Sequence, residues 1–233
     1  MRQAGIIALL VGCLLIAGCG SGSVNDTIRI ADGETREGGA RSVNGSIIVG
    51  TGANLEGNIS SVNGNVDVDE EATVGDVKTV NGAIRLGTGA TAGNVDSVNG
   101  NVRARRSVQI AGVRLVNGGL DTEAGTVVAG DVYMVNGTAD LRGTRVTGDI
   151  ITYGGQVNLA DGSEVAGNIV IRKPKGSFSA NDKPRIVIGP DSRVAGKVLA
   201  EREIRLFVHE SAAIGGAEGA EPESYADSLE SMD

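Results

Sequence analysis

A tetrapeptide that returns every 18 or 19 residues constrains this chain more than any other feature of its sequence. It reads SVNG, SVNG, TVNG, SVNG, LVNG and MVNG, and a seventh copy, TYGG, stands at 152–155. The shared asparagines are Asn44, Asn63, Asn81, Asn99, Asn117 and Asn136. A repeat of this length is one supersecondary unit that stacks on its neighbours, so it predicts a solenoid.

Apolar residues alternate with polar ones between successive tetrapeptides. The first interval carries Ile47 and Val49, then Ala53 and Leu55, then Ile59. A period of two is typical of short strands with one buried face. Gly, Asn and Asp separate the strands as turn residues do. The sequence therefore predicts an all-β, parallel β-solenoid with three strands in each coil of about 18–19 residues.

The composition indicates a narrow core, and the acidic C-terminal segment marks one end of the domain. Aromatic residues are only 2% of the chain and Gly is frequent, so aliphatic side chains must fill the interior. We expect a β-helix domain over 24–215, opened by VND at 24–26, and an acidic disordered tail over 216–233. The formal net charge of -8 disfavours a nucleic-acid partner, which requires a basic face.

The N-terminus predicts export and a lipid anchor. A charged start and a short apolar run make residues 1–18 a signal peptide, too short for a comfortable transmembrane helix. IAGC at 16–19 resembles the bacterial lipobox, in which Cys19 becomes the lipidated first residue. Residues 19–23 would then be the lipidated Cys and a short linker. Because Gly20 and not Asp follows the Cys, that resemblance implies the outer membrane, facing the periplasm.

The cadence of GTGANLEGNI (50–59) and GPDSRVAGKV (189–198) resembles the bactofilins, which are polymer-forming cytoskeletal proteins of bacteria. The resemblance implies a right-handed, three-faced β-helix that is able to join end to end and has no nucleotide and no enzymatic activity. The export signal departs from it, because bactofilins generally face the cytoplasm. The alternative is the left-handed hexapeptide helix of acyltransferases. Those enzymes rely on a catalytic His, and the single one here, His209, lies near the end of the repeat.

The asparagine column has two interpretations. We expect Asn to satisfy turn backbone groups and its neighbours along the stack, and the following Gly to supply a positive φ. A ligand-binding row of Asn is the alternative. On an outward column, Asp67 should lie beside Arg85 and Arg103 beside Asp121, in neighbouring coils.

An insertion at 172–185 interrupts the repeat. It carries a group of cations and one ring that could bind a protein or an anionic envelope polymer: Arg172, Lys173, Lys175, Phe178, Lys183 and Arg185. Loops that leave a rigid scaffold often hold binding sites. The alternative is that it covers a sheet edge.

A carbohydrate-active enzyme would need paired carboxylates, and Asp131 and Asp149 would lie one coil apart. Turn chemistry explains the same residues. No metal, nucleotide or cofactor motif is present in the sequence, and Tyr133 and Tyr153 are the sole pair of rings that could stack on a sugar. We therefore expect a non-enzymatic structural or scaffolding lipoprotein of the cell envelope. A binding module that uses the 172–185 loop is the alternative, and a β-helix enzyme ranks third.

Overall fold

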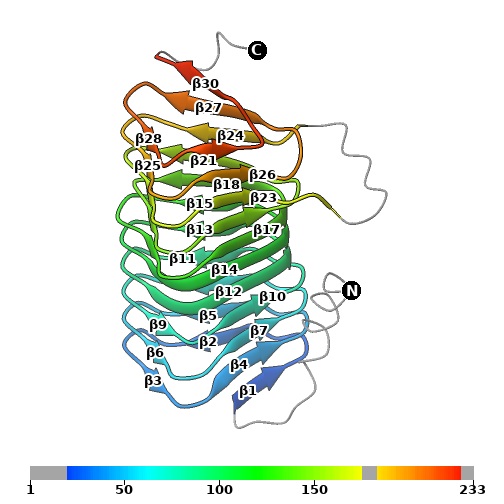
Figure 1. Ribbon diagram of the computed structural model, residues 1–233. Coiled ribbons are helices and arrows are strands. Elements are labelled where there is room, and N and C mark those ends of the chain that lie inside the picture. Colours follow the sequence, from blue (N-terminus) through cyan, green and yellow to red (C-terminus); the bar gives the residue numbers. More distant parts are fainter. Residues whose placement is uncertain (1–19, 175–182, 227–233) are drawn as a thin grey trace.

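The computed structural model describes residues 20–174 and 183–226, and over these ranges the chain is a single parallel β-solenoid. It winds about one axis as a stack of coils with the N-terminal coil at one end and the C-terminal coil at the other (Figure 1). Every strand pair is parallel, and no helix occurs among the described residues. The predicted fold class is confirmed.

The coil has three faces, and the first is a sheet of eleven strands. Its strands are β2 (Ile28–Ile30), β5 (Ile47–Val49), β8 (Val66–Val68), β11 (Ile84–Leu86), β13 (Val102–Ala104), β15 (Leu120–Thr122), β18 (Thr138–Arg142), β21 (Gln156–Ala160), β24 (Arg185–Ile188), β27 (Arg205–His209) and β30 (Pro222–Tyr225).

The other two faces form one sheet of nineteen strands. Its second-face strands are β3 (Thr35–Arg36), β6 (Asn54–Leu55), β9 (Thr73–Val74), β16 (Val127–Val128), β19 (Arg145–Val146), β22 (Glu164–Val165), β25 (Arg193–Val194) and β28 (Ala213–Ile214). The third-face strands are β1 (Gly20–Ser23), β4 (Gly39–Ser42), β7 (Ile59–Ser61), β10 (Val77–Thr79), β17 (Val132–Asn136), β20 (Ile150–Thr152), β23 (Ile169–Ile171), β26 (Val198–Ala200) and β29 (Ala217–Glu218). Two long strands, β12 (Thr91–Asn99) and β14 (Gln109–Asn117), run through both faces and join them.

Register places equivalent residues of successive coils directly beside each other. Ile47 pairs with Val66, and Val66 pairs with Ile84. Val62 follows the same register, because its N–H donates to Ser42 O while its carbonyl accepts from Asn81. Strands paired in this way lie about 4.8 Å apart. Equivalent positions of successive coils therefore lie over one another throughout the described residues.

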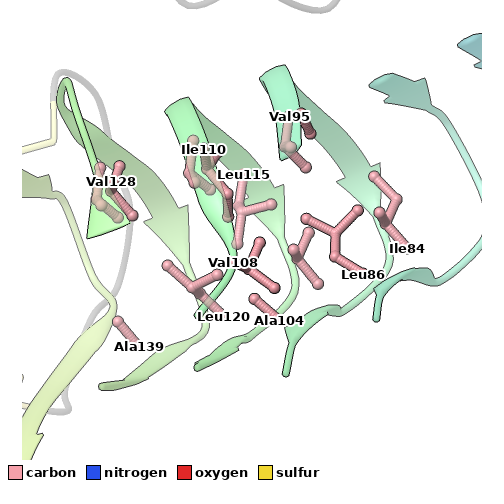
Figure 2. Packing of buried hydrophobic residues seen from close by; sticks show 14 of the residues in the cluster. Ile84, Leu86, Val95, Ala104, Val108, Ile110, Leu115, Leu120, Val128 and Ala139 are labelled. Atoms are coloured by element: carbon pink, nitrogen blue, oxygen red, sulfur yellow. The ribbon is translucent and has the colours of Figure 1, made fainter. Parts of the chain in front are cut away.

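One continuous apolar core fills the interior. The predicted inward columns are buried throughout, from Ile30 near the start to Leu206 near the end. Figure 2 shows Leu86, Ala104 and Leu115, from three different strands, pointing into the shared interior. Burying one such aliphatic side chain contributes about 1.5–3 kcal/mol. The stacking of many small columns thus replaces the large rings of an ordinary core.

Two predicted boundaries are wrong. Gly20–Ser23, expected as a linker, forms β1 and pairs with β4. The expected disordered tail continues the coil as β29 and β30 up to Tyr225, and only 227–233 lie outside the described residues. Small inward residues explain this extension, since Ala217 and Ala220 pack on the core. The acidic side chains of this segment remain exposed.

Candidate functional site

The tetrapeptide forms one corner of the coil, between the third face and the first. There the asparagine amides make an unbroken ladder in which each Nδ2 donates to Oδ1 of the preceding Asn. Its distances are 2.9 Å from Asn44 to Asn25, 3.0 Å from Asn63 to Asn44, 2.9 Å from Asn81 to Asn63, 3.0 Å from Asn99 to Asn81, 3.1 Å from Asn117 to Asn99 and 3.1 Å from Asn136 to Asn117. The ladder ends where Gly154 replaces Asn. The asparagines are therefore partners of one another.

The first residue of the tetrapeptide points inward, and where it is Ser or Thr its hydroxyl closes the turn. The Gly45 N–H donates to Ser42 Oγ at 2.8 Å, and the Gly64 N–H donates to Ser61 Oγ at 3.0 Å. These buried hydroxyls would be costly if they had no hydrogen-bond partner. This role was not predicted from the sequence, although Ser and Thr hydroxyls can hydrogen-bond nearby backbone groups in turns.

The structure gives a different reason for the tetrapeptide glycines from the positive φ that was expected. Only Gly137 among those that follow an asparagine of the six VNG copies has φ in that region, at 122°. At Gly45, Gly64, Gly82, Gly100 and Gly118, an added Cβ would collide with the backbone carbonyl oxygen of the equivalent residue one coil earlier. Close approach between coils, and not backbone conformation, therefore demands Gly there.

The valine of the tetrapeptide faces outward and forms an apolar stripe beside the asparagine ladder. Its members are Val24, Val43, Val62, Val80, Val98, Val116 and Val135. Val24, at the open end of the stripe, is 63% exposed, whereas the following valines are partly covered by their neighbours. Tyr153 continues the stripe, and Ile151 and Val170 widen it on the third face. This repeated surface was not anticipated from the sequence.

Tyr133 and Tyr153 meet at the widened part of the stripe. Their ring centroids lie 6.0 Å apart in an edge-to-face arrangement. Burial, followed by the hydrogen bond and charge interaction with Tyr153, raises the pKa of Tyr133 to about 12. Arg172 and Arg114 lie close enough to oppose that rise in pKa. The two rings contact each other edge to face and so do not form a flat stacking platform for a sugar.

The predicted charge pairs on the first face are confirmed. Arg85 Nη1 lies 2.9 Å from Asp67 Oδ1, and Arg103 Nε lies 3.2 Å from Asp121 Oδ2. Arg142 adds a second contact to Asp121 at 2.8 Å. A shallow hollow lies along this column and is lined by Arg85, Arg103 and Asp121. These charged side chains already form ion pairs between coils.

Asp131 and Asp149 lie one coil apart, as expected, in a column of turn residues. Asp131 Oδ1 accepts the Asp149 N–H at 2.9 Å, and Asp149 Oδ1 accepts the Asn168 N–H at 2.7 Å. Asn58 and Asp76 make the same contact at 2.9 Å lower in the stack. The two carboxylates therefore repeat a turn bond used along the rod.

The insertion residues divide between two stems. Arg172 and Lys173 are exposed on the leaving stem, and the Lys173 N–H donates to Glu201 Oε2 at 3.1 Å. On the returning stem, Lys183 Nζ lies 3.0 Å from Glu203 Oε2. Lys175 and Phe178 lie outside the described residues. One turn of the next coil, which contains Glu201 and Glu203, thus tethers both stems.

Arg185 belongs to the wall of the coil. Its guanidinium lies 5.3 Å from the ring centre of Phe207, which packs with Val187 and Tyr225 in a small cluster on the outside of the first face. The Nε atom of Arg185 is buried without a hydrogen-bond partner among the described residues. Arg185 therefore packs in the wall of the coil and is not exposed like Arg172 and Lys173.

His209 makes structural contacts at the C-terminal end of the rod. Ser211 N–H donates to its Nδ1 at 3.1 Å, which leaves Nε2 as the donor to Ala226 O at 3.0 Å. Its ring meets that of Tyr225 edge to face with centroids 5.0 Å apart. These contacts fasten the last strand to the preceding coil.

Cys19 lies outside the described residues. Within 20–174 and 183–226, no group of His, Cys, Asp and Glu is suited to hold a metal ion. A search of the same residues for a helix long and apolar enough to cross a bilayer also finds none. A scan of protein-family models matches no family, and searches of curated proteins and solved structures return no similar protein.

Proposed function

We propose that this chain is a non-enzymatic structural or scaffolding lipoprotein of a bacterial cell envelope. In this proposal, lipid on Cys19 anchors the rod at the outer membrane, facing the periplasm. The finer resemblance to bactofilins, carried by stretches such as GTGANLEGNI, adds self-association as the property to be tested.

One observation carries the proposal. The polar side chains that could have formed a catalytic or binding site instead make hydrogen bonds between coils. The asparagine amides bind one another, and Asp149 accepts a backbone N–H of the next coil. Asp121 likewise joins Arg103 and Arg142 across three coils. A surface whose polar groups are committed in this way supports a role in shape and spacing.

Lipid attachment is the first test. The full chain is expressed in a bacterium that has two membranes, fed with labelled palmitate and fractionated. We expect label and outer-membrane location for the natural chain and for Cys13→Ala, which changes a residue of the predicted signal. Cys19→Ala should lose both. Label retained by Cys19→Ala would refute the anchor.

Catalysis is tested separately, on the unlipidated chain from Gly20 onward. We expect no turnover of purified envelope glycans. Turnover that disappears in Asp131→Asn/Asp149→Asn, with an unchanged melting temperature, would replace the scaffolding role by the enzymatic one.

The second candidate is a binding module that uses the insertion. Its support is the tethering of both stems by Glu201 and Glu203 and the exposure of Arg172 and Lys173. The test measures co-sedimentation with purified peptidoglycan sacculi. The variant replaces 175–182 by a Gly/Ser segment of equal length, which preserves both stems. Binding lost at unchanged melting temperature supports this candidate, and absence of binding by the natural chain removes it for this polymer.

A further inference from the structure

Two regular columns of the coil change at its two ends, and both changes affect how another coil could be added. The first column is the tetrapeptide glycine, which runs from Gly45 to Gly155; Asp26 occupies it in the opening coil, and the last coils carry Pro184, Ile204 and Ala220 there. The second is the first-face column that begins at Ile28 and Ile47 and runs through Leu206, and Pro222 occupies it in the last described strand. We propose that Asp26 and Pro222 are end stops, which prevent copies of this chain from associating end to end by continuing the solenoid.

The argument at the N-terminal end is steric. An added Cβ at Gly45 would collide with the carbonyl oxygen of Asp26, and one at Gly64 would collide with that of Gly45. From Gly45 to Gly137, a Cβ in this column would therefore point toward the preceding coil and overlap its backbone. Asp26 carries a Cβ and a carboxylate in that direction. It is exposed, because none of the described residues forms a coil beneath it.

The corner at Asp26 is otherwise built like the others. Its N–H donates to Ser23 Oγ at 2.8 Å, as Gly45 does to Ser42 and Gly64 to Ser61. Asn25 also begins the asparagine ladder by accepting from Asn44. The backbone is thus ready for stacking, and the Asp26 side chain is the element that obstructs a further coil.

The argument at the C-terminal end concerns hydrogen bonding. In the early coils the residue of this column donates its N–H to the following coil: Ile28 to Ser46 O at 2.9 Å, Ile47 to Asn65 O at 2.9 Å and Val66 to Ala83 O at 2.9 Å. The register carries this column through Leu206 to Pro222. Proline has no N–H and is confined to positions where a sheet edge needs no donor.

Charge adds to this second stop. Glu218, Glu221 and Glu223 are exposed on the last coil, and charged residues and proline are the means by which proteins protect sheet edges from pairing. The two stops act at opposite ends, and any junction between copies would bring them together. Either one therefore suffices to prevent it. This inference does not depend on the proposed lipid anchor.

The test uses the unlipidated chain from Gly20 onward, which contains every described residue. Sedimentation and electron microscopy should show the natural chain as a monomeric rod. Asp26→Gly and Pro222→Ala should each remain monomeric alone, because the partner end still carries its stop. The double variant should form rods that lengthen with concentration at constant width.

Mixing the two single variants gives the sharpest readout. One free end on each variant allows a single junction, so the mixture should stop at a dimer with twice the mass of the monomer. End-to-end filaments of the natural chain would overturn the proposal. So would a double variant that remains monomeric while its circular dichroism and melting temperature match those of the natural chain.

A converse variant protects the test against a folding defect in the double variant. Gly45→Asp introduces in the second coil the side chain that Asp26 carries in the first. Its Cβ would meet the Asp26 carbonyl, so we expect the loss of most cooperative folding at the N-terminal end. If Gly45→Asp melts like the natural chain, the steric basis of the N-terminal stop is refuted.

Discussion

The side-chain amide of Asn81 donates a 2.9 Å hydrogen bond to the side-chain oxygen of Asn63, which lies 18 residues earlier in the chain. Asn99 in turn donates to Asn81 at 3.0 Å. The shared residue of the tetrapeptide therefore stabilises the contact between windings, and this role explains why the motif recurs with the period of the coil.

We expect Asn81→Ala to lower the free energy of unfolding by about 1–2 kcal/mol, because it removes one donated and one accepted ladder bond. Urea unfolding should show a lower midpoint with an unchanged slope. Asn136→Ala is the control, since Asn136 ends the ladder and, among the described residues, has a single ladder bond, to Asn117. Equal losses in the two variants would argue against the ladder as the cause.

Gly82→Ala should be more harmful than Gly52→Ala, although both replace a turn glycine. The Gly82 Cβ would collide with the carbonyl of Gly64, whereas Gly52 has open space and a φ of 65°. We expect a loss of about 3 kcal/mol for Gly82→Ala from overpacking. For Gly52→Ala we expect about 1–2 kcal/mol from the left-handed backbone. Thermal unfolding of both variants gives the order, and a reversed order would contradict the close-approach argument.

Glu71→Gly should stabilise the chain. Glu71 has φ of 58°, in a turn position where Gly52 and Gly89 stand in the neighbouring coils. Relief of the left-handed strain exceeds the entropy lost by Gly, with a net gain of about 0.5 kcal/mol. Thr73→Gly in the adjacent strand is the matched control and should destabilise. A lower melting temperature for Glu71→Gly would contradict the expectation.

Tyr133 gives a prediction about alkaline pH. Its folded pKa of about 12 lies above the ordinary value of 10.0, so folding favours the neutral phenol. That contribution is complete below pH 10 and is lost as the pH rises through 12. Absorbance titration of ionised tyrosine should show a late group near 12 that is absent in Tyr133→Phe. Burial also raises the pKa of Tyr225, and that shift should be present in both proteins. Titration of all folded tyrosines near 10 would refute the effect.

Much of the architecture could be predicted because the repeat states it many times. The inward columns, the pairing of Asp67 with Arg85 and the position of Val62 between neighbouring coils all follow from stacking equal positions. A solenoid makes such inference reliable, because each coil contacts only its neighbours and each column is a set of repeated observations.

The misses occur where one residue has two physical explanations. Gly after Asn is usual at positive φ, yet here the close approach of Gly45 to the Asp26 carbonyl decides its identity. The acidic composition after Gly215 predicts disorder. Ala217 and Ala220 nevertheless pack on the core, and the strands continue there. The sequence groups Arg185 with the other cations of the insertion, but Arg185 packs on Phe207 as part of the wall.

The uniform register has a consequence for how such a molecule changes size. Adding or deleting one tetrapeptide with the residues up to the next would lengthen or shorten the rod by about 4.8 Å and preserve its cross-section. Duplication in the gene can therefore adjust the span of this protein in equal steps. The two terminal windings would remain as they are, so a longer descendant would inherit the same finished ends.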